Sequence, residues 1–320
     1  VAMILGGISG SGPADSAAVG AVMLPSMLKA GYPRSFTAGV IAAAGSTDIL
    51  IPPSIAFVIY SLLVPQASVP ALFAAGMIPG ILSGLTLILV AWGLSVRHGF
   101  EAGVDDARPP FWQSLKEAGW GLAAPVIILG GMRSGVFTPT EAAVVAVFYG
   151  LVVGMLIYRS LSWKDVYGVL VESAEISSVI LTVVALASVF AWASNTLGTF
   201  DHLAAALLGT GLAEIPMLLS IQLLLLIAGM FLDAISIYFI FLPLRVPIAQ
   251  HFNWDLVWFG VIITMNMALG QFHPPLGVNL MVTCRMADVT MESTVPWVLW
   301  MVAAMAGTMF LVTFVPDLAL

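Results

Sequence analysis

Apolar residues fill long segments along almost the whole chain, and short polar stretches separate them. A mostly apolar segment of roughly 20 residues is long enough to cross the hydrocarbon core of a bilayer as one α-helix. This pattern predicts an all-α polytopic membrane protein. The uninterrupted helices are expected at about residues 71–96, 119–132, 142–158, 175–193 and 296–315.

Two further apolar segments are interrupted near their middle. The first, residues 34–63, contains the string AGSTDILIPPS, and the second, residues 256–283, contains LGQFHPPLG. A pair of prolines removes two backbone donors and pushes the residue before it out of the helical region. Inside a membrane such a break is tolerated only where protein or a water-filled cavity satisfies the freed polar groups. Each break therefore predicts a binding site, although a proline kink without function is the simpler alternative.

A pair of short apolar arms precedes each broken helix. The first pair meets at the string ISGSGPAD, and the second pair, residues 215–228 and 234–248, meets at residues 229–233. Each arm is too short to cross a core of about 30 Å comfortably, which suits a re-entrant helical hairpin. Pro13 fits the first position of the first returning helix, and Asp15 falls in its first turn.

The order of hairpin, broken helix and whole helix occurs twice. Asp15 and Pro25 recur 218 residues later as Asp233 and Pro243, and the two proline pairs are 222 residues apart. The matching features are interruptions, which apolar composition does not generate, so an internal repeat is predicted. We expect residues 1–96 to form the first repeat, 97–118 a cytoplasmic loop, 119–200 the scaffold and arm helices of the second repeat, and 201–320 its hairpin, broken helix and last helix.

The basic residues predict the orientation in the membrane. With the 97–118 loop in the cytoplasm, eight of the ten Lys and Arg residues fall on that side, and only Arg133 and Arg245 lie outside. The two hairpins then enter from opposite faces, which makes the repeats inverted. Inverted repeats allow one site at their interface to face either side of the membrane, which is the physical basis of alternating access.

Helix ends that meet near the middle of the membrane predict the chemistry of the site. The half-helices that begin near Pro13 and Pro53 direct N–H groups inward, which favours an anion, and the half-helix that ends near Gly45 directs carbonyl groups inward, which suits Na⁺. Small and polar residues add to these groups, and the candidates are Ser9, Ser11, Ser46, Thr47, Thr264, Asn266, Gly270 and Gln271. We expect one cation site in each repeat with an anionic solute between them. For each hydroxyl, a bond to its own helix is the alternative.

Asp15 and Asp233 are costly in apolar surroundings and are candidates for a functional role, with capping of a hairpin tip as the alternative. Paired aspartates also occur in intramembrane aspartyl proteases. Neither aspartate lies in a GxGD context, however, and a protease would leave the internal repeat unexplained. A non-transporting membrane scaffold, the other alternative, would leave the two breaks without a purpose.

Composition narrows the function classes further. The 320 residues are 60% hydrophobic and 8% charged, whereas a soluble domain carries roughly 25% charged residues. The net charge of −7 and the lack of a basic patch argue against nucleic acid as a partner. The single cysteine, Cys284, excludes an intrachain disulfide and a cysteine metal cluster.

Five strings of this chain together resemble one family. In order they are SGSGPADSAAVGAVMLPSM, ILIPPSIAFVIY, PVIILGGMRSGVFTPTEAAVVAVFYG, GMFLDAISIYFIFLP and HPPLGVNLMV. They resemble the large membrane subunit of tripartite ATP-independent periplasmic (TRAP) transporters, and the resemblance covers essentially the whole chain. Family members are usually longer at the N-terminus, so the first scaffold helices and the first arm of the first hairpin are expected to be missing here.

The resemblance implies an elevator-type transport subunit of the ion-transporter superfamily in the bacterial inner membrane. It implies coupling to a Na⁺ gradient and no bound organic cofactor. Two partners follow from it: a small four-helix membrane subunit, and a soluble periplasmic binding protein that delivers a carboxylate such as a C4-dicarboxylate or a sialic acid. A stand-alone divalent-anion/sodium symporter, which would need no binding protein, is the alternative within transport.

Carried over residue by residue, the family's ion and substrate region corresponds to the two tips and the two breaks of this chain. Sodium ligands are expected among Gly10, Ser11, Gly45, Ser46, Pro52, Gly229, Thr264, Gly270, Gln271 and Pro274, and substrate ligands among Ser11, Asp15, Thr47, Asp233, Asn266 and His273. Two residues depart from the family pattern. Asp48 stands where relatives usually have a small or apolar residue, and His273 stands where a threonine is common. These two side chains are expected to alter substrate preference or to couple a proton.

Replacement of His273 by threonine tests whether the imidazole takes part in transport. We expect the variant to flatten any pH dependence of uptake between about pH 5.5 and 7.5, because histidine changes charge in that range. Uptake by wild type and variant in proteoliposomes across this range is the measurement. An unchanged pH profile would remove His273 from proton coupling.

Overall fold

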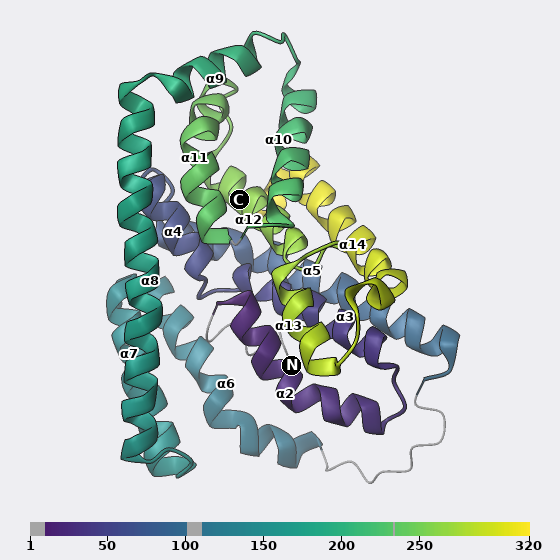
Figure 1. The fold of residues 1–320 in the computed structure, drawn as a ribbon. Coiled ribbons are helices and arrows are strands. Elements are labelled where there is room, and N and C mark those ends of the chain that lie inside the picture. Colours follow the sequence, from purple (N-terminus) through teal and green to yellow (C-terminus); the bar gives the residue numbers. More distant parts are fainter. Residues whose placement is uncertain (1–9, 101–110, 233) are drawn as a thin grey trace. The chain divides into compact units, whose positions relative to one another are not determined.

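The computed structural model describes residues 10–100, 111–232 and 234–320, and every regular element in these ranges is a helix (Figure 1). The prediction of an all-α protein is therefore confirmed for the described part of the chain. Five of the described helices are long and apolar enough to cross a membrane, and they lie at Val69–His98, Pro139–Ile157, Trp163–Ser194, Ala234–His251 and Met291–Phe314. The prediction that the arm at residues 234–248 is too short to cross was therefore wrong, because its helix continues to His251. Residues 1–9, which precede the first predicted tip, the loop residues 101–110 and Asp233 lie outside the described residues.

The chain divides into two compact units. One unit consists of Val1–Asp106 together with His202–Leu320, and the other of Ala107–Asp201. The first unit holds both broken helices and both predicted hairpin tips, so it contains the candidate site. Its helices are α2 (Gly12–Lys29), α3 (Arg34–Ser46), α4 (Ile55–Leu63), α5 (Val69–His98), α10 (Glu214–Gly229), α11 (Ala234–His251), α12 (Leu256–Gly270), α13 (Val278–Ala287) and α14 (Met291–Phe314).

The first predicted break is confirmed. Helix α3 ends at Ser46, a single 3₁₀ turn follows at Thr47–Ile49 (η1), and α4 begins at Ile55. Pro52 and Pro53 lie in the gap, and Ser54 closes it, because its Oγ donates to the carbonyl of Ile49 and accepts from the N–H of Phe57. At 1.5 Å per residue, α3 and α4 are roughly 20 Å and 14 Å long, so neither crosses a membrane alone.

The second predicted break is also confirmed. Helix α12 ends at Gly270 and α13 begins at Val278. The segment between them folds back on itself, since the N–H of Asn279 donates to the carbonyl of Gln271 at 2.9 Å. Gly277 has a φ of 43°, and a Cβ atom there would lie 2.8 Å from the carbonyl oxygen of Gln271, so this turn requires glycine. Both proline pairs are joined by a cis peptide bond.

One displacement relates the two repeats. Helices α2, α3 and α5 begin at Gly12, Arg34 and Val69, and α11, α12 and α14 begin 222 residues further on. The match of Asp15 with Asp233 and of Pro25 with Pro243 at 218 residues was therefore wrong. The displacement that fits the helices pairs Pro25 with Pro247 and Asp15 with Ile237. Asp233 is therefore not the equivalent of Asp15 in the second repeat.

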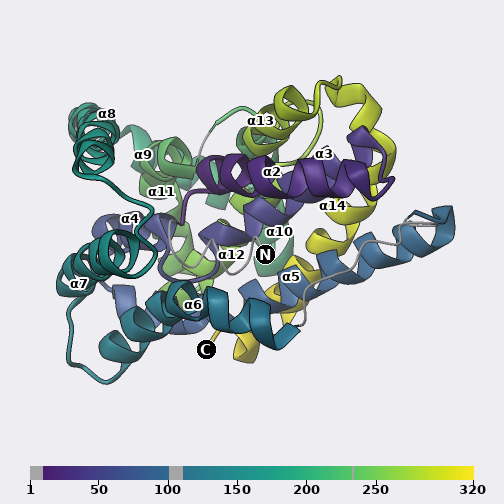
Figure 2. The same ribbon diagram turned by 90° about the horizontal axis from the view of Figure 1, so that it is seen from below.

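The contacts between the repeats are reciprocal. Helix α2 packs against α3 and α13, and α11 packs against α12 and α4, so α2 and α11 each touch both broken helices (Figures 1 and 2). Helices α5 and α14 pack against each other, and there the Oγ1 atoms of Thr86 and Thr308, which are 222 residues apart, lie 3.1 Å from each other. Reciprocal contacts of this kind are expected where an approximate two-fold axis relates the two repeats.

A double-mutant cycle on Thr86 and Thr308 tests the contact at this axis. We expect Thr86→Val and Thr308→Val to show a coupling free energy of about 0.6 kcal/mol, the usual value for hydrogen bonds between membrane helices. Thermal unfolding of the purified protein in detergent is the measurement. The pair Thr86→Val and Ser293→Ala is the control and should be additive, because Ser293 is exposed in the first turn of α14, about 22 Å along the helix from Thr308.

Helix α12 forms the centre of the first unit. Every residue from Trp258 to Gly270 is buried, which is typical of a helix that is apolar on all sides and surrounded by protein. Arg245 of α11, which the charge pattern places outside, is also buried at 1% exposure, with its Cζ atom 4.9 Å from the ring centre of Phe241. It therefore gives no guide to orientation.

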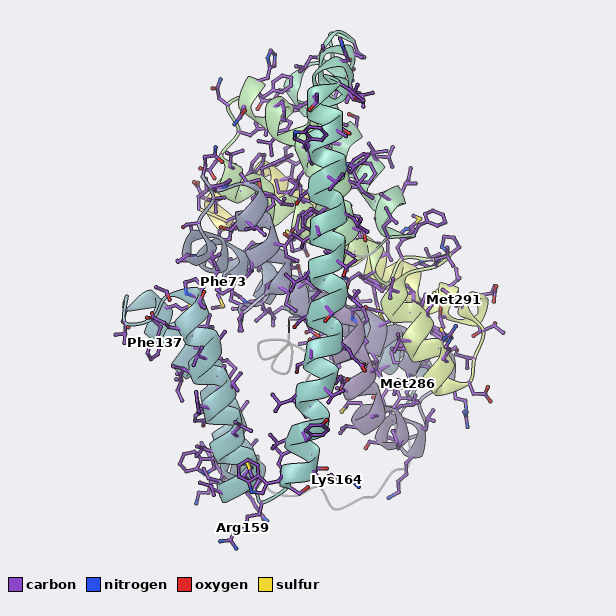
Figure 3. The ribbon with its side chains drawn as sticks, turned by 60° about the vertical axis from the view of Figure 1, so that its left-hand side comes forward. Phe73, Phe137, Arg159, Lys164, Met286 and Met291 are labelled. Carbon is purple, nitrogen blue, oxygen red and sulfur yellow. The ribbon has the colours of Figure 1, made fainter. Side chains whose placement is uncertain are left out.

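The second unit contains α6 (Phe111–Arg133), α7 (Pro139–Val152), a π-helical turn at Val153–Ile157 (η2) and α8 (Trp163–Thr196). Thr138 and Glu141 form a capping box at the start of α7. Arg159 and Lys164 lie at the turn that leads into α8 (Figure 3). Among the described residues, none in the 18-residue apolar window of α8 is buried.

Three sequence predictions differ from the structure here. Helix α6 begins at Phe111 inside the predicted loop, because Trp112, Leu115 and Trp120 continue a helical spacing of apolar residues. Helix α8 begins at Trp163 rather than near residue 175, because Ser162 and Asp165 form a second capping box. Between the predicted helix at 175–193 and the predicted arm at 215–228, where no helix was expected, the chain forms the short helix α9 (Thr199–Leu208).

Candidate functional site

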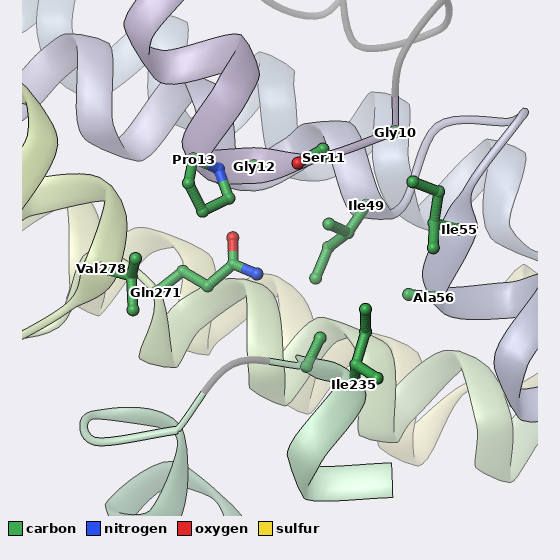
Figure 4. A pocket seen from close by; sticks show the side chains of 11 residues that line it. Gly10, Ser11, Gly12, Pro13, Ile49, Ile55, Ala56, Ile235, Gln271 and Val278 are labelled. Atoms are coloured by element: carbon green, nitrogen blue, oxygen red, sulfur yellow. The ribbon is translucent and has the colours of Figure 1, made fainter. Parts of the chain in front are cut away.

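A cavity of about 140 Å³ lies in the first unit between the two tips and the two breaks (Figure 4). Its walls come from the segment before α2, from both sides of the first break, from the start of α11 and from both sides of the second break. The lining residues are Gly10, Ser11, Gly12, Pro13, Ile49, Ile55, Ala56, Ala234, Ile235, Gln271 and Val278.

Four helices begin at the wall of this cavity. The first residues of α2, α4, α11 and α13 are Gly12, Ile55, Ala234 and Val278, and all four line it. The first N–H groups of a helix have no partner within the helix, and they carry the positive end of the helix dipole. None of the eleven lining residues has an ionisable side chain. Of the groups that line the wall, the backbone N–H groups at these helix starts are the ones that suit an anion.

Gln271 supplies the side-chain amide of the cavity. It is 4% exposed, and its Oε1 atom has no hydrogen-bond partner among the described residues. Its side chain extends toward the start of α2 (Figure 4), where a Cβ atom at Gly12 would lie 2.1 Å from Oε1. The Oδ1 atom of Asn279 is also buried without a partner. The two amides are close to Gly12, since the same Cβ would lie 3.1 Å from Nδ2 of Asn279.

Glycines allow the tips to touch the breaks. Gly10 has a φ of 63°, and a Cβ atom there would lie 2.7 Å from the carbonyl oxygen of Pro53. Gly229 ends α10 and packs on Gly270, the last residue of α12: a Cβ atom on Gly270 would lie 2.8 Å from the Cα and carbonyl carbon of Gly229. Each tip therefore meets a break backbone to backbone, with no room for a side chain.

The structure brings three of the sequence-predicted residues to the cavity wall: Gly10, Ser11 and Gln271. Ser46 and Thr47 are fully buried behind it, and their hydroxyls donate to the carbonyls of Ala43 and Ala44 at 2.7 Å. Each hydroxyl oxygen keeps lone pairs that a cation could use. The role of these residues as sodium or substrate ligands remains a prediction.

The other predicted residues do not line this cavity. Thr264 and Asn266 lie on the buried helix α12, where Thr264 bonds with the hydroxyl of Tyr238 at 2.6 Å and Asn266 Nδ2 donates to the carbonyl of Gln222 at 2.8 Å. His273 is half-buried in the second break, with its Nδ1 at the carbonyl of Pro274. Six more residues of the tips and breaks do not line the cavity: Asp15, Gly45, Pro52, Gly229, Gly270 and Pro274. Asp233 lies outside the described residues.

Apolar residues make up much of the wall, and the sequence reasoning missed them because it searched for polar side chains. Ile49, Ile55, Ala56, Ile235 and Val278 belong to this group. All but Ile49 stand at the first or second position of a helix that follows a predicted interruption. The sequence could therefore have identified these four residues, because the first two helix residues after a predicted interruption can be located from it.

The chain matches a family model over residues 1–318, and the model describes the "Tripartite ATP-independent periplasmic transporter, DctM component". The chain belongs to this family. The resemblance to TRAP transporters found in the sequence is thereby confirmed, and the relatives are permeases rather than enzymes.

Three TRAP relatives show how far the similarity extends. The isethionate TRAP transporter permease protein DctMQ of Oleidesulfovibrio alaskensis is 38% identical over 98% of this chain. The C4-dicarboxylate TRAP transporter large permease protein DctM of Rhodobacter capsulatus is 36% identical over 98% of the chain, and the sialic acid TRAP transporter permease protein SiaT of Haemophilus influenzae is 32% identical over 99%. The chain spans 49%, 74% and 51% of these relatives, respectively.

Proposed function

We propose that this chain carries an organic anion across the bacterial inner membrane by secondary active, sodium-coupled transport. The observation that supports this most directly is the meeting of four helix N-termini at one cavity between the two broken helices. An anionic group placed there is stabilised by several backbone N–H groups at once, without the strong charge of a lysine or arginine that would hold it too tightly to release.

The substrate class follows from the relatives. Their names refer to isethionate, C4-dicarboxylates and sialic acid, all of which are organic anions. A cavity with N–H groups at its polar ends and Ile49, Ile55 and Ile235 on its sides suits a small molecule with an anionic group and a short carbon skeleton.

Sodium is the proposed coupling ion, and the oxygen groups around the cavity fit it. Hydroxyl oxygens of Ser46 and Thr47 stand beside the C-terminal end of α3, and Gln271 Oε1 is an unpartnered buried oxygen directly after α12. Helix C-terminal ends and unwound carbonyl groups are the usual sodium ligands in transporters with broken helices. Among the described residues no group of three His, Cys, Asp or Glu side chains could hold a metal, so the site would use neutral oxygens.

The proposed partners are a small membrane subunit and a periplasmic binding protein that delivers the anion. The family name itself describes a tripartite periplasmic system. The proposed transport movement is of the elevator type, in which the tips and breaks travel together as one body. The backbone contacts of Gly10 with Pro53 and of Gly229 with Gly270 support this, because they join each tip rigidly to a break.

The test is uptake by proteoliposomes that contain the full-length subunit and its small membrane partner. Labelled isethionate, succinate and sialic acid are offered under an inward Na⁺ gradient, with and without the cognate binding protein. Uptake that needs both the gradient and the binding protein supports the proposal. Uptake without the binding protein would instead favour a stand-alone symporter, and no Na⁺ dependence would contradict sodium coupling.

A further inference from the structure

We infer that Arg245 is a specificity-determining residue of the transport site: its buried, unpaired charge attracts anions to the cavity from a distance and favours dianions over monoanions. The inference rests on the proposed function and adds a charge preference to it. Arg245 lies in α11, is 1% exposed, and its Nε and Nη2 atoms have no hydrogen-bond partner among the described residues. A charged side chain inside a membrane segment is costly, so a functional role is the first hypothesis for it.

The described helices that pack most extensively against α11 bring no acid that pairs with Arg245. These helices are α4, α10 and α12. Helices α4 and α12 contain no Asp or Glu, and α10 contains only Glu214, its first residue. Glu214 is exposed and accepts a bond from Trp254 Nε1 at 2.8 Å, while Asp255 caps the first turn of α12. Because a guanidinium keeps its proton inside proteins, one positive charge remains uncompensated there.

The guanidinium of Arg245 points along α11 toward the cavity. Its Cζ atom lies 4.9 Å from the ring centre of Phe241, which precedes it in the helix. Helix α11 begins at Ala234, which lines the cavity. At about 100° and about 1.5 Å per residue, Ala234, Phe241 and Arg245 share one face of the helix. The positive charge therefore lies about 10 Å along the helix from the cavity wall.

Buried side chains surround this part of α11. Ile237, Tyr238 and Leu242 are at most 2% exposed, and the Tyr238 hydroxyl is bonded to Thr264 Oγ1 at 2.6 Å. Buried charges are screened much less than exposed ones. At an effective dielectric constant of about 20, one unit charge about 10 Å away raises the affinity for a monoanion roughly tenfold. Since the attraction is proportional to the charge of the ligand, a dianion gains roughly a hundredfold.

A charge at this distance complements the helix N-termini at the wall. The backbone N–H groups there bind an anionic group by contact, whereas Arg245 acts through its electrostatic field alone. Its effect therefore depends on the total charge of the ligand and little on the ligand's shape. Among organic anions, dicarboxylates gain more from Arg245 than monoanions such as isethionate.

Two thiol reagents of opposite charge measure the field at the cavity without any substrate. Ile55 lines the cavity and is 38% exposed, so Ile55→Cys places a reactive thiol there (Figure 4). The full-length subunit with its small membrane partner is treated in detergent with anionic sulfonatoethyl methanethiosulfonate or cationic trimethylammonioethyl methanethiosulfonate. The ratio of the two rates cancels the intrinsic reactivity of the thiol. Adding Arg245→Met should lower the anion-to-cation rate ratio by about tenfold or more.

Arg97→Met in the same reporter protein is the matched control. Arg97 is exposed in the last turn of α5, so solvent screens its charge, and the rate ratio should change by less than about twofold. Cys284 is buried, and the rate of the protein without the reporter is subtracted. Arg245→Met should unfold at the same temperature as the wild type or higher, because an unpaired buried charge is unfavourable. Arg245→Gln takes its place if the methionine variant does not fold. A rate ratio unchanged by the loss of Arg245 overturns the inference.

Succinate and its monomethyl ester provide the second measurement, because they share a carbon skeleton and differ by one charge. Their affinities are obtained from the stabilisation of the purified complex against heat. Arg245→Met should weaken succinate binding about tenfold more than binding of the ester. Equal losses for the two ligands overturn the inference and leave the proposed function intact. If neither ligand binds the wild type while the reagent ratio still falls in Arg245→Met, the field of Arg245 is supported and the proposed substrate class fails.

Discussion

The variant Ala56→Asp should abolish anion uptake at ordinary substrate concentrations. Ala56 is the second residue of α4 and lines the cavity, so an aspartate there places a carboxylate where the substrate anion is expected. Two like charges about 4 Å apart repel by about 4 kcal/mol at an effective dielectric constant of about 20, which corresponds to roughly a thousandfold loss of affinity. The variant should still fold, because a negative charge in the first turn of a helix is favourable.

The matched control for this prediction is Ala56→Asn, which has nearly the same shape without the charge. The measurements are the concentration dependence of uptake in proteoliposomes and the stabilisation of the purified protein by the substrate against heat. We expect the asparagine variant to lose far less affinity than the aspartate variant. Equal losses would mean that only space had been removed, and the interpretation of the cavity as an anion site would be contradicted.

The variant Gly270→Ala should damage both stability and transport. Its Cβ atom would lie 2.8 Å from two backbone atoms of Gly229, and neither can rotate away as a side chain would. Overpacking of a tight contact costs about 1–3 kcal/mol. The added methyl group should therefore separate the tip from the break, and uptake should fall together with the unfolding temperature.

Gly307→Ala provides the control for the steric argument. Gly307 lies within α14 and is exposed, and a Cβ atom added there would have no neighbouring atom within 4 Å among the described residues. Alanine there should be neutral or should stabilise the helix by up to about 1 kcal/mol. The two glycine variants are thus expected to change stability in opposite directions. A Gly270→Ala protein that is as stable and active as Gly307→Ala would show that the tip and the break are not held together.

Several parts of the fold could be read from local pattern because they depend on local chemistry. The proline pairs after Thr47 and Gly270 stop a helix wherever they occur, since the missing N–H groups and the ring geometry act within a few residues. The capping box of Thr138 and Glu141 is equally local. Helix starts without such a local sequence feature were predicted too far along the chain. Helix α6, for example, begins at Phe111 rather than near residue 119.

The register of the internal repeat shows the limit of this approach. Identical residues 218 positions apart matched as well as identical residues 222 positions apart. The sequence alone does not say where in its helix each of these residues lies. The helix starts and the contact of Thr86 with Thr308 both give 222. Pro247 was therefore overlooked as the equivalent of Pro25, although it was visible in the sequence.

By itself, the sequence determined that this protein is helical, apolar enough for a membrane, broken at two equivalent places and a relative of TRAP transporters. These properties follow from composition, from proline chemistry and from shared strings, all of which act within short stretches of chain. Only the tertiary structure decided which residues meet. The meeting of four helix N-termini at one cavity depends on the packing of helices that are distant in sequence, and no local pattern encodes that packing.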